Sequence, residues 1–477
     1  MKTSLRICAD YTAFSNNIIL IDQLNQLSKI GLNKSTHTAA KAFFEAKAGN
    51  VFQQIFDGKS LYIVKLEPNK EAHKNLEGCR KLGNQLSKTL NAAKQKEASF
   101  LNATGKPELS SAFAEGLILS SYEFNKYKTK DTSGKTLQTL HVDTSSADKK
   151  SLDEIAALAE ANFFTRDLIN EPPAEMTAVH LSKAFVQAGK TYGFSVKVLD
   201  KRKIEALKMG GLLAVNRGSV DPPTFSILEY KPAKAKNKKP IVLVGKGVVY
   251  DTGGLSLKPT PNSMDLMKSD MSGAAAVGGI FIAAAKLKLP IHIIGLVPAT
   301  DNRPSGNAYA PGDVVKMMSG LNVEVLNTDA EGRMILADAL HFAKQYKPEL
   351  VFDFATLTGA AVRAIGSLAT AYMGSADENI KKKIETSGNA TYERLIHFPL
   401  WEEYGDWIKS EIADINNVGP GEAGHITAGK FLEHFTDYPW LHFDIAGTAF
   451  VTKEDSYRGK YATGVGVRLI THFLKNY

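Results

Sequence analysis

The chain has 477 residues, which is enough for two or three domains with sizeable cores. Its apolar share of 44% and charged share of 23% are those of an ordinary folded protein, which excludes disorder as the starting assumption. The net charge of +8 leaves room for an anionic partner, but the basic runs are short and indicate solvent-exposed faces first.

The N-terminal segment and the cysteines bear on the compartment. Cys8 and Cys79 are too few for a disulfide framework and show no Cys-x-x-Cys spacing, which suits a reducing environment. No apolar signal core follows Met1, and the longest apolar run, 273–285, is too short to cross a bilayer. We therefore expect a cytoplasmic protein without a membrane partner.

Residues 1–150 are predicted to form a smaller N-terminal α/β domain. Apolar runs at 18–21 and 61–64 indicate strands, and 75–94 has the pattern of a helix with a polar face. The polar stretch 126–135 predicts a loop.

Residues 151–173 are predicted to connect this domain to the next. Ile155, Leu158 and Ala159 recur at helical spacing, which predicts a helix over 151–168. The sequence Asn170-Glu171-Pro172-Pro173 ends it, because proline disfavours a helical residue before it.

Residues 174–477 are predicted to form the catalytic domain, because strands and helices alternate there. The predicted strands are 194–199, 224–230, 240–245, 291–297 and 350–355, and the predicted helices are 180–190, 203–208, 273–286 and 330–343. Uninterrupted apolar strands in such an alternation predict an α/β fold with a largely parallel central sheet flanked by helices. Sites in these sheets form at the carboxyl ends of the strands.

Charged residues gather at the predicted strand-to-helix junctions. They are Lys246, Asp251, Lys258, Asp270, Asp329, Glu331 and Arg333. Four converging carboxylates repel one another unless cations neutralise them, and divalent metal ions would do so. A simpler alternative is that each acid caps a helix or stabilises its dipole. That explanation suffices for any one acid, but it accounts poorly for all of them at one edge of the sheet.

Several motifs resemble those of the leucyl (cytosol) aminopeptidase family. The most specific is Asn327–Arg333, and the two others with metal-binding character are Gly245–Gly254 and Met267–Asp270. Further similar stretches are Asn170–Pro173, Gly210–Gly218, Asn302–Gly312, Ala355–Gly359 and Asp444–Gly447. The resemblance is strong over about 165–470 and weak over 1–150.

The resemblance implies a set of residue roles. Two divalent ions, Zn²⁺ or Mn²⁺, would be held by Lys246, Asp251, Asp270, Asp329 and Glu331. Lys258 would polarise the substrate carbonyl, and Arg333 would hold a bicarbonate ion that serves as general base. The pocket for the first side chain would be lined by Met267, Thr356, Leu357, Gly359, Ala446 and Ala449. Ala449 stands where a larger residue is expected, which implies a wider pocket.

The predicted function is therefore a metal-dependent aminopeptidase that releases Leu-like N-terminal residues from peptides through a water activated by two metals. The resemblance also implies a homohexamer. Two alternatives remain open, a family-like fold that binds DNA through its basic N-terminal half and a different metallohydrolase such as a phosphatase. A serine hydrolase is disfavoured because no Gly-x-Ser-x-Gly motif is present.

Overall fold

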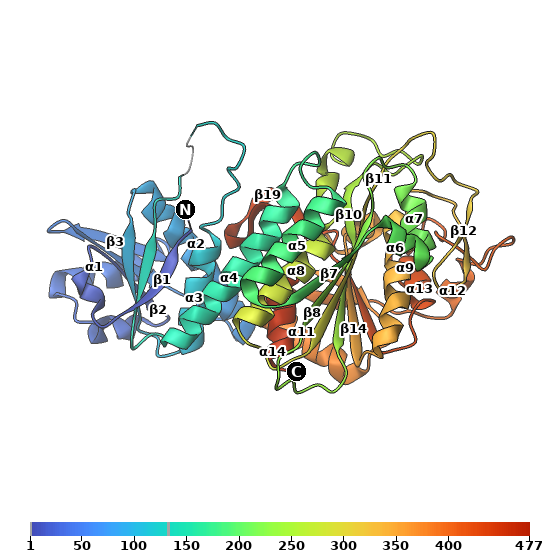
Figure 1. Ribbon diagram of the computed structural model, residues 1–477. Helices are drawn as coiled ribbons and strands as arrows, with labels where there is room; N and C mark the ends of the chain where they lie inside the picture. The colour runs from blue at the N-terminus through green and yellow to red at the C-terminus, as the bar shows by residue number, and fades with distance from the viewer. Residues whose placement is uncertain (1, 131–133) are drawn as a thin grey trace. The chain divides into compact units, whose positions relative to one another are not determined.

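The computed structural model describes residues 2–130 and 134–477, so the predicted 126–135 loop lies partly outside the described residues. Its contacts divide the chain into two units. One comprises 1–160 with 454–459, and the other comprises 161–453 with 460–477. The predicted α/β class with a smaller N-terminal domain is confirmed (Figure 1). The predicted boundaries at 150 and 173 stay predictions.

The first unit contains a six-stranded sheet. In spatial order its strands are β1 (Ser4–Cys8), β6 (Thr139–Asp143), β5 (Glu97–Asn102), β2 (Asn16–Ile21), β4 (Lys59–Lys65) and β3 (Val51–Phe56). Only β3 pairs antiparallel, with β4. The helices are α1 (Lys34–Glu45), α2 (Ala72–Ala92) and α3 (Pro107–Leu119). The two predicted strands and the predicted helix are present, since β2 and β4 carry fully buried apolar runs.

The predicted connecting helix is α4 (Lys149–Asn170), whose residues are shared between the two units. It ends at Asn170, and Glu171, the residue before Pro172, is outside the helix, as the restriction that proline places on its predecessor predicts. No helix in the described part of the chain is both long and apolar enough to cross a membrane.

The second unit contains a nine-stranded, largely parallel sheet. Its strands in order are β16 (Leu395–His397), β15 (Thr370–Met373), β18 (Trp440–Asp444), β14 (Leu350–Ala355), β9 (Ile241–Gly245), β11 (Ile293–Asn302), β8 (Thr224–Tyr230) and β7 (Ser195–Leu199), with β10 (Gly247–Asp251) paired to β11. The central strands are parallel to one another, whereas β7, β8 and β15 form antiparallel pairs. The strand β10 was not predicted, because we expected a loop after Gly245.

Helices cover both faces of this sheet (Figure 1). On one face lie α5 (Ala178–Tyr192), α8 (Ser272–Lys286) and α14 (Val467–Lys475), and on the other lie α7 (Gly210–Asn216), α9 (Glu331–Ala343) and α13 (Gly424–Glu433). The remaining elements are α6 (Lys201–Ala206), α10 (Gly359–Ile365), α11 (Glu378–Thr391), α12 (Glu403–Asp406), β12 (Val314–Lys316), β13 (Asn322–Glu324), β17 (Ile415–Asn416), β19 (Phe450–Asp455) and β20 (Gly459–Ala462). The four helices predicted in this region are present as α5, α6, α8 and α9, whereas α7 and the helices α10 to α14 were not predicted.

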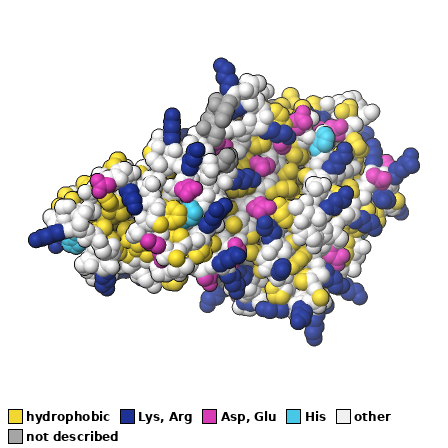
Figure 2. Space-filling model, turned by 60° about the vertical axis from the view of Figure 1, so that its left-hand side comes forward, with side chains coloured by type: hydrophobic (Ala, Val, Ile, Leu, Met, Phe, Trp, Pro, Cys, Tyr) yellow, Lys and Arg dark blue, Asp and Glu magenta, His cyan; other side chains and the backbone are white. Residues whose placement is uncertain are grey.

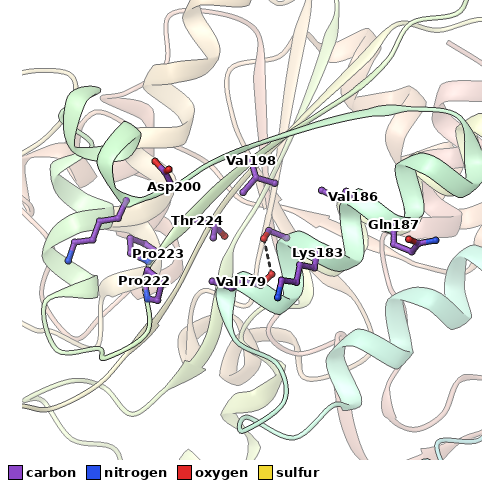
Figure 3. A pocket seen from close by; sticks show the side chains of 11 residues that line it. Val179, Lys183, Val186, Gln187, Val198, Asp200, Pro222, Pro223 and Thr224 are labelled. Atoms are coloured by element: carbon purple, nitrogen blue, oxygen red, sulfur yellow. Dashed lines mark hydrogen bonds between the residues drawn. The ribbon is translucent and has the colours of Figure 1, made fainter.

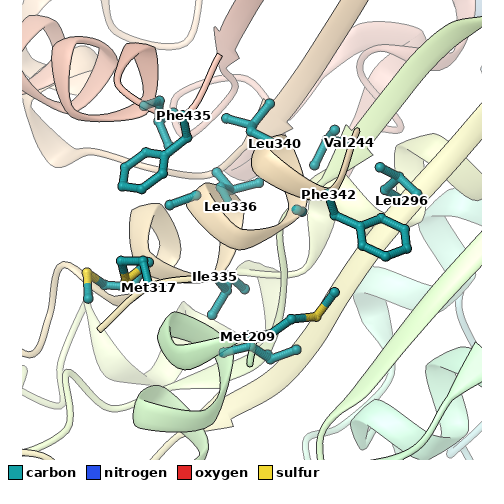
Figure 4. Packing of buried hydrophobic residues seen from close by; sticks show 14 of the residues in the cluster. Met209, Val244, Leu296, Met317, Ile335, Leu336, Leu340, Phe342 and Phe435 are labelled. Atoms are coloured by element: carbon teal, nitrogen blue, oxygen red, sulfur yellow. The ribbon is translucent and has the colours of Figure 1, made fainter. Parts of the chain in front are cut away.

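The helix α9 is fixed by the core beneath it. Ile335, Leu336 and Leu340 pack between the sheet residues Val244 and Leu296 and neighbouring helices (Figure 4). All but one residue of α9 are buried, so the helix cannot shift without opening a cavity in a close-packed interior. Its first residues, which include Glu331 and Arg333, are therefore held at the edge of the sheet.

Candidate metal centre

Asp251 lies at the end of β10, where the sheet sets its orientation. The register between β10 and β11 is irregular before Asp251, which then pairs with Asn302. Asn302 Nδ2 donates to Asp251 Oδ1 at 2.9 Å, and the Gly253 amide donates to the same oxygen at 2.8 Å. Sequence reasoning missed Asn302 as a site residue, although it begins one of the motifs noted above.

Asp329 and Glu331 reach the same place from the start of α9. One carboxylate oxygen from each of Asp251, Asp329 and Glu331 lies within 4.8 Å of the others. The loop before α9 is tied to the β10 side, because Thr328 Oγ1 donates to the Gly253 carbonyl at 2.7 Å. This tie brings acids far apart in sequence to one point.

Both predicted lysines lie among these carboxylates. Lys246 Nζ is 2.8 Å from Asp270 Oδ1 and 2.9 Å from Glu331 Oε1. Lys258 Nζ is 2.9 Å from Asp251 Oδ2 and 2.5 Å from Asp329 Oδ1. The five candidate ligands and Lys258 are thus all in one cluster.

The charges of this cluster do not balance. Four carboxylates face two ammonium groups, which leaves an excess of two negative charges when all are ionised. Burial and the charge of Glu331 raise the pKa of Asp251 to about 7, and the same two causes raise the pKa of Asp329. Burial alone lowers the pKa of both lysines, but the surrounding carboxylates raise it on balance. The lysines therefore stay charged and still do not neutralise the acids.

Three buried carboxylate oxygens of the cluster make no hydrogen bond among the described residues. Asp329 Oδ1 is paired with the Lys258 ammonium, whereas Asp270 Oδ2 and Glu331 Oε2 have neither a hydrogen bond nor an ion pair. A buried, unpaired carboxylate oxygen is strongly unfavourable unless a cation approaches it. Oxygen ligands with an excess of negative charge suit divalent ions such as Mn²⁺ or Zn²⁺. The residues of this cluster therefore suit the divalent metal ions that the sequence predicted.

Arg333 is buried beside this cluster. One of its Nη atoms donates to the Asn417 carbonyl at 2.7 Å, and its Nε has no hydrogen-bond partner in the described structure. Burial lowers the pKa of the guanidinium to about 10. A buried guanidinium with an open donor is suited to a small anion.

The predicted pocket residues approach the cluster from β14 and the loop after it. Thr356 Oγ1 donates to Asp270 Oδ1 at 2.8 Å, and the Thr356 carbonyl accepts from Lys246 Nζ at 2.9 Å. The Met267 carbonyl accepts from the Asp270 amide at 3.2 Å. Thr356 therefore lies directly at the cluster, whereas the bond of Met267 is a local backbone turn that ends at Asp270.

Asp444 organises a second group of pocket residues. Its Oδ1 accepts from the amides of Leu357 and Ala446, each at 3.2 Å. Gly359 begins α10, and Ala449 is 1% exposed in the turn after Ala446. Asp444 was not predicted as a site residue, although its motif was noted.

Fold and centre together define a metal-binding enzyme of the α/β class. The catalytic-domain model of the cytosol aminopeptidase family matches residues 163–471, and the N-terminal-domain model matches residues 70–131. The chain belongs to the cytosol aminopeptidase family and is an aminopeptidase, a hydrolase that acts on peptides.

Similar proteins extend over most of the chain. A probable cytosol aminopeptidase of Chlorobaculum tepidum is 48% identical over an alignment of 388 residues, and the alignment covers 78% of this chain and 76% of the relative. One of Geobacter sulfurreducens is 45% identical over 408 residues, 83% of this chain and 81% of the relative. The match thus includes part of the N-terminal domain.

Two solved structures share the fold throughout. A mutant of tomato leucine aminopeptidase has a TM-score of 0.88 at 26% identity and covers 100% of this chain and 97% of its own. The bottromycin maturation enzyme BotP, in complex with Mn, has a TM-score of 0.86 at 29% identity over 97% of this chain and 99% of its own. The second protein binds a metal of the kind that the carboxylate cluster suits.

Proposed function

We propose that this aminopeptidase releases Leu-like residues, with broad tolerance, from peptide N-termini by means of two divalent ions in the carboxylate centre. The observation that carries the proposal is the excess of negative charge with two unpartnered carboxylate oxygens, Asp270 Oδ2 and Glu331 Oε2. A cluster built only for stability would pair these atoms internally.

The residues that would hold the ions are Lys246, Asp251, Asp270, Asp329 and Glu331. When bound, Zn²⁺ or Mn²⁺ ions supply Lewis acidity and lower the pKa of a water molecule towards neutrality. Lys246 would have to release its proton to become a ligand, because an ammonium group has no lone pair. Asn302 would keep Asp251 in position for this task.

Lys258 and Arg333 would act on the reacting groups. Lys258 remains protonated among its carboxylates, so its ammonium can donate to the scissile carbonyl oxygen as negative charge develops there. The open Nε–H of Arg333 would help to hold a bicarbonate ion as the proton acceptor. Neither role requires a serine or cysteine nucleophile.

The pocket would set the preference for the first side chain. Its lining would be Met267, Thr356, Leu357, Gly359, Ala446 and Ala449. Because alanine at 449 adds little volume, the pocket would accept Leu, Met or Phe.

The deciding experiment combines elemental analysis with an aminoacyl-anilide assay. We expect two divalent ions per chain, loss of leucyl-anilide hydrolysis with phenanthroline, and recovery with Zn²⁺, Mn²⁺ or Co²⁺. N-acetyl-leucyl-anilide, which lacks a free amine, serves as the matched control and should not be cleaved. Full activity in demonstrably metal-free enzyme would refute the proposal, and hydrolysis of a phosphoester instead would favour the phosphatase alternative.

The homohexamer is proposed on the resemblance alone, by analogy. Light scattering should give a mass well above that of a dimer, and a mass near the 51.8 kDa of one chain at micromolar concentration would contradict it. The cytoplasmic location stays a prediction. On the face that Figure 2 shows, basic and acidic side chains are interspersed, so that face gives DNA binding no specific support.

A further inference from the structure

The strand β7 forms one edge of the nine-stranded sheet. It pairs antiparallel with β8 on one side, with Lys197 opposite Ile227. Within the described residues no strand pairs with its other side. An unpaired edge presents backbone N–H and C=O groups that can accept another strand.

Two hollows lie on opposite faces of this edge. One has a volume of about 390 Å³ and is lined by Val198 of β7 together with apolar residues of α5 and of the segment before β8, namely Val179, Val186, Pro222 and Pro223 (Figure 3). The other has a volume of about 700 Å³ and is lined by Lys197 and Leu199 of β7 and by Leu207, Ile227, Phe342 and Tyr346.

The two hollows follow the alternation of the strand. Because successive side chains of a strand point to opposite faces, Val198 faces the first hollow while Lys197 and Leu199 face the second. A strand added beside β7 would place its own side chains alternately into the two hollows. Recognition by strand addition combines backbone hydrogen bonds with such alternating pockets.

The charges around the hollows select an acidic occupant. Four lysines line them: Lys183 and Lys201 the first, Lys197 and Lys203 the second. Two acids line them as well, Asp200 the first and Glu229 the second, so each hollow has two lysines against one carboxylate. Each hollow therefore has an excess of one positive charge for a ligand to meet.

The same charges disfavour a second copy of this chain. A symmetric antiparallel pairing centred on the five-residue β7 would set Lys197 directly opposite its own counterpart. Like charges in such a pair are destabilising. An acidic partner removes this repulsion and adds attraction.

We propose that the outer edge of β7 binds an extended peptide segment whose apolar centre is flanked by acidic residues. The segment adds a strand to the sheet, its apolar side chains enter the two hollows, and its carboxylates meet the four lysines. No lining residue belongs to the carboxylate cluster, so this binding is separate from hydrolysis and does not depend on its mechanism.

The test uses the full chain and a labelled peptide, acetylated and amidated so that no free amine is present, with three central apolar residues between two pairs of glutamates. Fluorescence anisotropy should show saturable binding that weakens with salt. Lys197→Glu should weaken it about tenfold, because an attraction becomes a repulsion. Lys238→Glu, the same charge change in an exposed loop outside both hollows, should leave it unchanged.

Hydrogen exchange locates the binding. The peptide should slow exchange of amides in Ser195–Leu199, while circular dichroism confirms that both variants are folded. Equal binding of a peptide with lysines in place of the glutamates, equal loss in both variants, or protection elsewhere would overturn the proposal. Protection of these amides on raising the protein concentration without peptide would show that a second copy covers the edge and would overturn it as well.

Discussion

Two buried charge clusters in this chain differ in how their charges are paired. In the first unit, Glu77 accepts from the Tyr457 hydroxyl at 2.9 Å and lies 3.2 Å from Arg458 Nη2. Arg80 Nε donates to Glu115 at 2.6 Å, so two carboxylates meet two guanidinium groups. The buried charges of this cluster balance, with the exposed Asp455 3.4 Å from Arg458 at its rim, and they join α2, α3 and the 454–459 segment.

The carboxylate cluster of the second unit has the same ingredients in another ratio. Its four acids meet only two lysines, and two of its oxygens are left without partners. The comparison teaches that buried charge alone does not indicate function. An excess of negative charge with unpartnered carboxylate oxygens indicates a ligand, whereas a cluster whose buried charges balance indicates a structural role.

The largest expected effect is a loss of turnover when an acid of the carboxylate cluster is removed. Asp329→Ala and Glu331→Ala should each abolish turnover, far beyond the roughly 10–100-fold loss expected when a group that only orients a ligand is removed. Both variants should stay folded, because Lys246 keeps its pairing with Asp270 and Lys258 keeps its pairing with Asp251. Steady-state kinetics and thermal denaturation check both statements. Asp265→Ala, an exposed acid near Asp270, is the control, and near-normal turnover in either cluster variant would contradict the assignment.

Removing an acid from the charge cluster of the first unit should lower stability and leave turnover unchanged. Glu77→Ala leaves Arg80 and Arg458 without their shared carboxylate, and breaking a buried pair costs ~3–5 kcal/mol. Hydrogen exchange of α2 amides should show this loss, while turnover per folded molecule is kept. Glu454→Ala breaks the exposed pair with Lys88 in the same unit and should cost only ~0–1 kcal/mol. An equal loss of stability in the two variants would show that the buried cluster has no greater structural role than an exposed pair.

The two lysines sharpen the comparison within the second cluster. Lys258→Ala should keep the metal ions and lose ~2.7–4 kcal/mol of transition-state stabilisation, a fall in kcat on the order of 10²–10³-fold. Lys246→Ala should lower metal content, because its Nζ is a candidate ligand. Elemental analysis with kinetics separates these outcomes, and Lys268→Ala is the control. Metal loss in the Lys258 variant would show that the roles are reversed.

The smallest expected effect concerns a third buried pair, which is neutral only when a histidine is protonated. Burial alone lowers the pKa of His442, but Asp353, 2.6 Å from its Nδ1, raises it on balance. A raised folded-state pKa adds stability that is fully present below the unfolded value of about 6.5 and is lost as pH rises through the folded value. Thermal midpoints should therefore decline over that window, and Asp353→Asn should flatten the decline. An unchanged slope in the variant would exclude this pair as its cause.

Sequence patterns predicted the elements whose cause is local. The strands at 224–230 and 350–355 match β8 and β14 residue for residue, because each mostly apolar run begins just after a proline, Pro223 or Pro348, which marks its start. The second strand after Gly245 was missed, since its two ends carry glycine and aspartate, which normally indicate turns.

The predicted site residues converge, but their partners could not be read from the sequence. Asn302 and Asp444 act by orienting other groups, and an amide or a lone acid has no spacing that distinguishes this role. Which carboxylates each lysine contacts depends on side-chain direction across loops that are far apart in sequence. Such contacts are set by tertiary packing and not by local pattern.

Gly332 lies between the candidate ligand Glu331 and Arg333 in the first turn of α9. A Cβ at this position would lie 2.4 Å from Cε and 2.6 Å from Nζ of Lys246. Any other residue there would displace the lysine from Asp270 and Glu331 while leaving every charged residue of the centre intact. Position 332 can therefore serve as a diagnostic when related chains are sorted into active enzymes and inactive paralogues: a chain with all the acids and both lysines, but with a side chain at this position, should have lost the reaction.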